Sequence, residues 1–156
     1  MLLLRGWYSQ LQCVIRWQNN YGGSFPVTCA VRQGGVLSPY LFALYIDDLI
    51  DSLRLSGYGL YISQLFIGCL LYADDIVLLS PSCFGLRHLV SICEHFGSYW
   101  DIKFNPLKSQ LMTFGGSNPN VYRPINMNSS TIPWVNKVKY LSIWECISWV
   151  TLERQI

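Results

Sequence analysis

The sequence predicts an α+β domain built on an antiparallel sheet, and three observations lead to that class. A β-hairpin pattern comes first, with two apolar runs flanking a turn-rich stretch. Two segments with apolar residues at helical spacing follow, and a second hairpin pattern separates them. Short β-prone runs fill the rest of the chain. This order of hairpin, helix, hairpin, helix and strands is typical of an α+β fold.

The composition describes a folded domain, or part of one, with few charged groups. Apolar residues make up 51% and aromatic residues 15% of the 156 residues, which excludes intrinsic disorder. Charged residues are only 13%, against about 25% in typical domains. We therefore expect faces that normally pack against further segments of a larger protein. The net charge of +2 is no signature of nucleic-acid binding and does not exclude it.

Membrane insertion and secretion are not expected. The longest apolar run, Leu65 to Leu79, contains Asp74 and Asp75 at its centre, where carboxylates in a bilayer are costly. The run from Leu2 to Leu4 is too short for a signal peptide, and Arg5 follows it. The six cysteines form no C-x-x-C pair, so no zinc site is expected. We expect an intracellular protein of the cytoplasm or nucleus, with no membrane partner.

The first hairpin and the first helix are predicted from turn and capping residues. Residues 11–17 and 25–31 are β-prone, and residues 19–24, rich in Asn and Gly, would form the loop between them. Ser38 can cap a helix, and Pro39 suits its first position. Leu41, Tyr45 and Leu49 recur every four residues, and the helix should stop near Gly57.

Two buried strands, residues 65–71 and 76–79, should flank the sequence Tyr72-Ala73-Asp74-Asp75. Ser82 can cap a second helix, whose apolar stripe consists of Leu86, Leu89, Cys93, Phe96 and Trp100. Later strands are expected at 102–104, 109–114, 121–125, 132–135 and 138–141, with a loop or linker at 115–120.

The adjacent carboxylates Asp74 and Asp75 are the most informative residues. Burying both within an apolar run costs several kcal/mol unless they are paired, hydrated or bound to a metal. A hairpin tip would place them at the edge of the sheet. There they could bind Mg²⁺, which prefers carboxylate and phosphate oxygens as ligands. Taken alone, an Asp-Asp pair is more typical of a polar turn. Ordinary hairpin tips favour Asn-Gly or Asp-Gly, however, and no glycine is present here.

Four motifs in order along the chain point to one family. Tyr72-Ala73-Asp74-Asp75 resembles the Y-x-D-D box of reverse transcriptases, and the upstream residues 32–39, RQGGVLSP, resemble their R-Q-G-x-x-L-S-P block. Residues 104–109, FNPLKS, are similar to the N-x-x-K-[ST] block, and residues 138–141, VKYL, to the start of the K-Y-L-G block. A single short motif is weak evidence, whereas the ordered set is specific. The sequence resembles the reverse transcriptase of a non-LTR (LINE-type) retrotransposon over about residues 5 to 141.

The resemblance implies a polymerase palm, a ferredoxin-like antiparallel sheet packed on helices. It also implies RNA-directed DNA synthesis by two-metal nucleotidyl transfer, with Mg²⁺ or Mn²⁺ as cofactor. The partners would be an RNA template, a DNA primer and deoxynucleoside triphosphates. Group II intron and telomerase polymerases share a similar box, but the wording of the other blocks is closer to the LINE type.

The resemblance also implies roles for individual residues. Asp74 would be the chief metal ligand, assisted by Asp75. Tyr72 and Ala73 would lie beside the primer terminus, and Lys108 near the triphosphate as a proton donor to pyrophosphate. The last group would contact the incoming nucleotide and template, and comprises Arg32, Gln33 and Gly34.

The sequence also departs from the family pattern. No acidic residue precedes Asp47, so the family's other catalytic Asp, expected upstream of Arg32, is absent from these residues. The first palm strand and the fingers are expected to be missing. Ser142 stands where the fourth block has Gly, and Trp144 to Ile156 fit no expected pattern. The chain therefore reads as a truncated fragment, inactive alone.

We expect residues 1–114 to form a partial palm, 115–143 the end of the palm and its connection toward a thumb, and 144–156 an atypical tail that could be out-of-frame. The alternative function is a non-catalytic, retroelement-derived remnant that binds nucleic acid or protein. In either case, the polymerase segments that normally cover its apolar faces would be missing.

Overall fold

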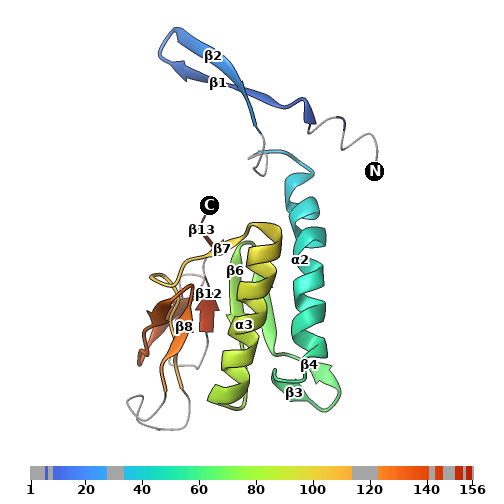
Figure 1. Ribbon diagram of the computed structural model, residues 1–156, viewed down its shortest axis with the longest axis vertical. Helices are drawn as coiled ribbons and strands as arrows, with labels where there is room; N and C mark the ends of the chain where they lie inside the picture. The colour runs from blue at the N-terminus through green and yellow to red at the C-terminus, as the bar shows by residue number, and fades with distance from the viewer. Residues whose placement is uncertain are drawn as a thin grey trace. The chain divides into compact units, whose positions relative to one another are not determined.

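The computed structural model describes residue 6 and residues 9–27, 34–113, 123–140, 143–145, 150–152 and 154–155. The chain divides into two compact units, Met1–Phe42 and Ala43–Ile156, and each is described by itself (Figure 1). Within the described residues, no helix combines the length and the apolar character that crossing a bilayer requires.

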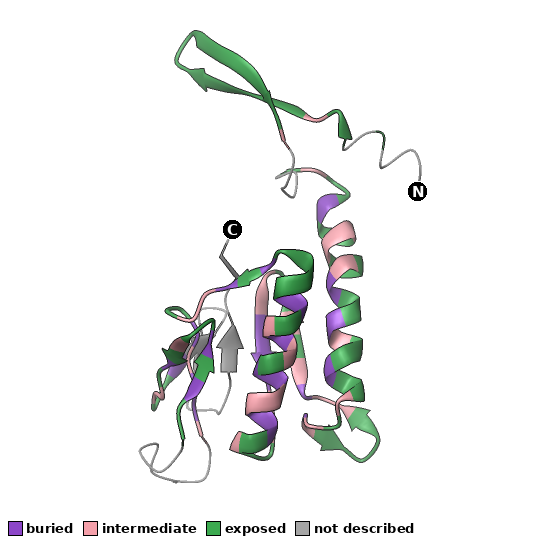
Figure 2. Cartoon of the chain, in the orientation of Figure 1, coloured by how far each residue is buried: buried purple, intermediate pink, exposed green. Residues whose placement is uncertain are grey.

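The first unit contains an antiparallel hairpin of β1, Gln12–Trp17, and β2, Asn20–Pro26. The predicted hairpin is present, but the predicted loop over residues 19–24 is wrong. Trp17 pairs directly with Asn20, and Gly22 and Gly23 lie opposite Ile15 as a β-bulge within the second strand. Two consecutive glycines favour such a bulge because they accommodate the extra residue without side-chain crowding. Every residue of both strands is exposed (Figure 2).

Helix α2, Ser38–Leu55, begins one residue before Pro39, the predicted first position, so that Ser38 lies inside the helix rather than capping it from outside. The helix ends just before Gly57, whose φ of 74° stops the helical backbone. Its buried side chains are Ile46, Leu49 and Leu53. The opposite face carries exposed carboxylates, among them Asp51, which pairs with Arg54 one turn later. Of the three residues that the four-residue spacing singled out, Leu49 is buried, whereas Leu41 and Tyr45 are only half-buried.

The second unit is organised around a three-stranded antiparallel sheet in the order β12-β6-β5. These strands are β5, Cys69–Tyr72, β6, Asp75–Leu78, and β12, Val150–Leu152. The central strand, β6, pairs with both neighbours, and Ile76, Val77 and Leu78 are at most 2% exposed. The C-terminal residues, for which the sequence suggested no structure, supply one edge of this sheet.

A small hairpin precedes the sheet, formed by β3, Tyr61–Ile62, and β4, Leu65–Phe66. At the base of this hairpin, the backbone passes very close to itself at Gly59 and Gly68. A Cβ atom on Gly68 would lie only 2.7 Å from the Cα atom of Gly59, so any side chain there would force the backbones apart.

Helix α3, Cys83–Trp100, packs against β6. Its predicted cap is confirmed, because the Ser82 hydroxyl oxygen accepts a hydrogen bond of 3.1 Å from the backbone N–H of Gly85. The predicted stripe is also confirmed except at its end, since Trp100 remains 39% exposed. The helix ends at Asp101, which adopts the left-handed conformation with φ 56°. The buried members of the stripe are Leu86, Leu89, Cys93 and Phe96.

Short antiparallel pairs complete the second unit. Strand β7, Lys103–Phe104, pairs with β13, Arg154–Gln155, and β8, Ile125–Met127, pairs with β9, Ser130–Ile132. Strand β10, Val138–Tyr140, pairs with β11, Ile143–Glu145.

The expected strand at 109–114 is reduced to isolated bridge residues at Gln110 and Leu111, of which Leu111 pairs with Trp134, and residue 114 lies outside the described residues. Of the strand expected at 121–125, residues 121–122 lie outside them too. Helices α2 and α3 together with small antiparallel sheets, in the part of the chain that the structure describes, agree with the predicted α+β class.

The half-buried thiol of Cys69 on β5 makes stability depend on pH. Burial raises the pKa of Cys69 from 9.0 to about 11. Since the unfolded thiol ionises first, the stabilisation is complete below pH 9 and is lost as the pH rises toward 11. We predict that the free energy of unfolding falls between these pH values by up to about 2 kcal/mol more in the wild type than in Cys69→Ala. Urea titrations at several pH values measure this difference.

The exposed thiol of Cys13 offers the matched control, because Cys13→Ala should keep the wild-type dependence on pH. Identical slopes for Cys69→Ala and the wild type would contradict the assignment.

Candidate active site

The carboxylates Asp74 and Asp75 lie at the tight turn between β5 and β6. The last ladder pair is Tyr72 with Asp75, and Ala73 and Asp74 form the loop between them. At the turn the strands each reach one residue further than predicted, because Tyr72 and Asp75 belong to the ladder. The buried strand predicted at residues 65–71 is otherwise wrong, because Leu65–Phe66 form β4, β5 begins only at Cys69, and no residue of β5 is buried. Asp75 is thus held by strand pairing, whereas Asp74 is presented by the turn.

The turn holds Ala73 in an unfavourable backbone conformation. Its φ is 51°, in the left-handed region that a residue with a Cβ atom adopts at a cost of about 1–2 kcal/mol. Such conformations persist only where the surrounding structure imposes them, and they cluster at functional sites. Here the ladder on both sides imposes the turn.

The two carboxylates are both half-buried. Cross-strand partners share a face of the sheet, so Asp75 lies on the same face as Tyr72, which is 62% exposed. Directly after Asp75 the strand enters the core at Ile76. The arrangement therefore places one carboxylate at the boundary between core and solvent, with the other beside it in the turn.

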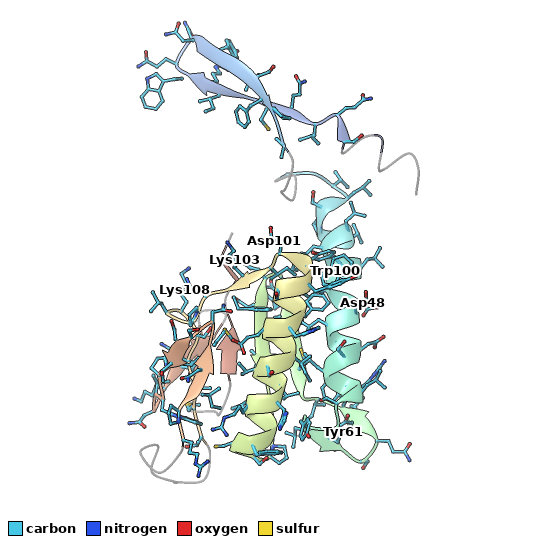
Figure 3. The ribbon with its side chains drawn as sticks, viewed as in Figure 1. Asp48, Tyr61, Trp100, Asp101, Lys103 and Lys108 are labelled. Atoms are coloured by element: carbon cyan, nitrogen blue, oxygen red, sulfur yellow. The ribbon has the colours of Figure 1, made fainter. Side chains whose placement is uncertain are left out.

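The turn lies at a defined end of the second unit. Figure 1 shows β6 beginning at the end where α3 finishes and β7 starts, away from the small β3–β4 hairpin. Lys103, Lys108 and Asp101 are labelled toward this end in Figure 3.

Lys108 lies in a turn whose hydrogen bonds explain the surrounding motif residues. The Asn105 side-chain oxygen accepts from the Leu107 N–H at 3.0 Å, and the Asn105 carbonyl accepts from the backbone N–H groups of Lys108 and Ser109. The Ser109 hydroxyl, fully buried, donates to the same carbonyl at 2.8 Å. Asn105 and Ser109 are therefore structural members of the motif, and they present Lys108 with an exposed side chain.

The residues expected to contact nucleotide and template are only partly described. Arg32 and Gln33 lie outside the described residues. Gly34 is exposed, and its φ of 76° is a conformation that glycine adopts without strain. Gly34 belongs to the first unit and the carboxylate turn to the second.

A hollow of about 550 Å³ near the end of α3, with polar and apolar lining in similar shares, was not predicted from the sequence. Glu94 and Asn128 line it, and the Glu94 carboxylate accepts a hydrogen bond of 2.6 Å from the backbone N–H of Asn128. This bond fastens the β8–β9 turn, where Asn128 and Ser129 both have positive φ. The signal in the sequence was weak, because Asn-Ser replaces the usual Asn-Gly of such turns. The other residues that line the hollow are Gly97, Ser98, Asp101, Ile102, Lys103, Phe104 and Pro106.

The carboxylate turn does not by itself complete a metal site. Among the described residues, no group of three or more His, Cys, Asp or Glu side chains converges on one point. The α2 carboxylates Asp47, Asp48 and Asp51 are exposed on their helix. Asp74 and Asp75 therefore offer two carboxylates of the kind that a divalent cation binds, and no third ligand joins them among the described residues.

Comparison with known protein families identifies the family to which the chain belongs. The family model for reverse transcriptase (RNA-dependent DNA polymerase) matches residues 2–144, so the chain belongs to the reverse transcriptase family. The prediction made from the four motifs is thereby confirmed.

A curated relative is the RNA-directed DNA polymerase from the mobile element jockey of Drosophila melanogaster. The two sequences are 25% identical over 140 residues, which cover 84% of this chain and 14% of the relative. The chain thus spans about one seventh of the length of that protein.

The strain at Ala73 predicts an unusual effect of glycine. We expect Ala73→Gly to raise the free energy of unfolding by up to about 1 kcal/mol, because relief of the positive φ exceeds the added chain entropy. The matched control is Ala43→Gly at an exposed position inside α2, which should lower it by about 1 kcal/mol. Chemical denaturation of both variants gives the comparison, and a loss of stability in Ala73→Gly would contradict strain at the turn.

The turn around Lys108 predicts that substitutions of Ser109 and Lys108 change the stability of the chain by different amounts. Ser109→Ala should lower the free energy of unfolding by about 1 kcal/mol, because it removes the hydrogen bond that a fully buried hydroxyl donates. Lys108→Ala, at an exposed position, should change it by less than about 0.5 kcal/mol. Equal losses in the two variants, measured by urea unfolding, would show that Lys108 is itself part of the scaffold.

Proposed function

We propose that this chain is part of the palm of a non-LTR (LINE-type) reverse transcriptase and contributes its Asp-Asp carboxylates to metal-dependent nucleotidyl transfer. The observation that carries the proposal is the strained β5–β6 turn, which presents Asp74 and Asp75 at one end of a buried ladder. Membership of the reverse transcriptase family and the likeness to a mobile-element polymerase support it.

The roles of the two carboxylates follow from their positions. Asp74 lies in the loop and can turn its oxygens toward a cation, whereas Asp75 is fixed by the ladder and assists from the neighbouring position. A bound Mg²⁺ or Mn²⁺ would supply charge neutralisation at the transferring phosphoryl group. The half-burial of both carboxylates strengthens their attraction for a cation relative to that of fully exposed groups.

The remaining residues would bind the substrates. The exposed ring of Tyr72 would lie beside the primer terminus, with Ala73 next to it. Lys108 would approach the triphosphate of the incoming deoxynucleotide and could protonate pyrophosphate. A further group, Arg32, Gln33 and Gly34, would contact the nucleotide and the RNA template.

Nucleotidyl transfer with two metals needs carboxylates from more than one strand. The described residues offer one such pair, and no third ligand converges on it. We therefore expect the isolated chain to bind one cation weakly and to leave a DNA primer on an RNA template unextended.

The proposal is tested by locating the cation on the full chain. In NMR spectra, Mn²⁺ added at low concentration should broaden the amide signals of Tyr72, Ala73 and Asp75 before others. Asp74→Asn should abolish this broadening because it removes the negative charge and keeps the shape of the side chain.

The control is Asp47→Asn on the exposed face of α2, which should leave the broadening unchanged. Broadening centred on α2, or unaffected by Asp74→Asn, would refute the assignment of the site. Primer extension by the chain alone, lost in Asp74→Asn, would support the carboxylate site but refute the expected inactivity.

A further inference from the structure

The charge of the chain is unevenly divided between its two units. Residues 1–42 carry three arginines, Arg5, Arg16 and Arg32, and no acidic residue. Of the 11 basic and nine acidic residues in the whole chain, eight basic and all nine acidic ones therefore fall in residues 43–156. The first unit has a charge of +3 and the second −1, although the total of +2 had suggested no polyanion-binding region.

The tip of the β1–β2 hairpin concentrates exposed aromatic rings beside one of these arginines. The rings of Trp17 and Tyr21 are 74% and 68% exposed. Arg16 and Tyr21 are cross-strand partners on one face of the hairpin, and Trp17, the last residue of β1 before the turn, lies on the other face. We call Arg16, Trp17 and Tyr21 the tip cluster. Figure 3 shows side chains projecting from both sides of this hairpin.

The guanidinium of Arg16 is held in place without being neutralised. Its carbon atom lies 5.6 Å from the centre of the Tyr21 ring, and its Nε–H donates a hydrogen bond of 3.0 Å to the Gln18 carbonyl. Among the described residues, no carboxylate pairs with it. A planar, oriented and uncompensated guanidinium can bind a phosphate through two nitrogens or stack against a base.

Among the described residues of its own unit, nothing buries the strands of the hairpin or accounts for these rings. All residues of β1 and β2 are exposed, and an isolated two-stranded hairpin is only marginally stable in water. A molecule that binds the hairpin tip should therefore offer both flat apolar faces and negative charge. Unpaired nucleotides offer both, whereas the paired bases of a duplex have their faces covered.

We propose that the tip cluster is a binding site for single-stranded nucleic acid, in which bases stack on Trp17 and Tyr21 and Arg16 contacts the phosphate backbone. The amide side chains of Gln18, Asn19 and Asn20 in and beside the turn add donors and acceptors for base edges. The proposal goes beyond nucleotidyl transfer, because binding at the tip needs neither a metal ion nor a nucleotide.

Binding is measured with the full chain and fluorescently labelled oligouridine, without divalent metal, at several salt concentrations. Wild-type affinity should fall as salt rises, and unlabelled duplex RNA should compete poorly. Trp17→Ala should weaken binding roughly fivefold or more, whereas Trp17→Phe should retain most of the affinity because it preserves a stacking face. Arg16→Gln should weaken binding and reduce the salt dependence by about one counterion.

Matched variants in the second unit serve as controls. Tyr99 is 75% exposed, so Tyr99→Ala removes a ring as accessible as that of Trp17 and should leave affinity unchanged. Arg123→Gln removes an exposed arginine and should likewise have no effect. Circular dichroism confirms that each variant remains folded.

Asp74→Asn separates this proposal from the proposed catalytic site. Unchanged binding in Asp74→Asn supports a site at the tip, and loss of binding in this variant would place the contact at the carboxylate turn and overturn the proposal. Oligodeoxythymidine in place of oligouridine shows whether the 2′-hydroxyl contributes.

Three other results would also overturn the proposal. They are no binding by the wild type, binding that is independent of salt, and equal affinities for Trp17→Ala, Arg16→Gln and the wild type. Concentration-dependent dimerisation that Trp17→Ala abolishes, in a chain that does not bind oligouridine, would instead identify the tip as an interface between copies.

Discussion

The antiparallel ladder between β5 and β6 is the constraint on which the rest of the second unit depends. Ile76, Val77 and Leu78 are buried in the core, and each contributes roughly 1.5–3 kcal/mol through loss of apolar contact with water. The same ladder closes at Tyr72 and Asp75 and forces Ala73 into its strained conformation. Hydrophobic burial at one end of the strands therefore stabilises a carboxylate turn at the other.

The motif residues divide into those that present chemistry and those that hold the backbone. Asn105 and Ser109 shape the turn that carries Lys108, and Ser82 fixes the start of the helix that packs on β6. Neither group would suffice alone, because a lysine or carboxylate on an unconstrained loop would lose conformational entropy on meeting a substrate. A short sequence motif can thus specify a site only together with its scaffold.

The fold could be predicted from the sequence where burial and capping agree. Both helices begin close to the expected residues, and α2 ends where expected, because the Ser82 cap and the positive φ of Gly57 act locally. The first hairpin was misjudged because glycine pairs occur in loops and in bulges alike, and only the cross-strand register distinguishes them. Pairing of Arg154–Gln155 with β7 could not be predicted, since contacts between segments distant in sequence leave no local pattern.

The candidate site was predictable to a different degree. The order of four motifs indicated the family and drew attention to Asp74, Asp75 and Lys108, but spacing alone could not show that Asp75 lies in the ladder and Asp74 in the loop. The hollow beside Glu94 and the exposed hairpin tip arise from three-dimensional packing. The tip was also hidden by the averaging of charge over the whole chain.

The pairing of β12 with β6 has a consequence for the solubility of the chain. A strand bonded on one side only presents a row of amide and carbonyl groups that another chain can extend. Strand β12 covers this row along Ile76, Val77 and Leu78, which are also among the most apolar residues of the sheet. Sequence changes in the C-terminal residues that prevent β12 from forming would therefore expose the unpaired edge of β6 beside the carboxylate turn. Strands of other chains could then pair with that edge, and aggregation would begin there.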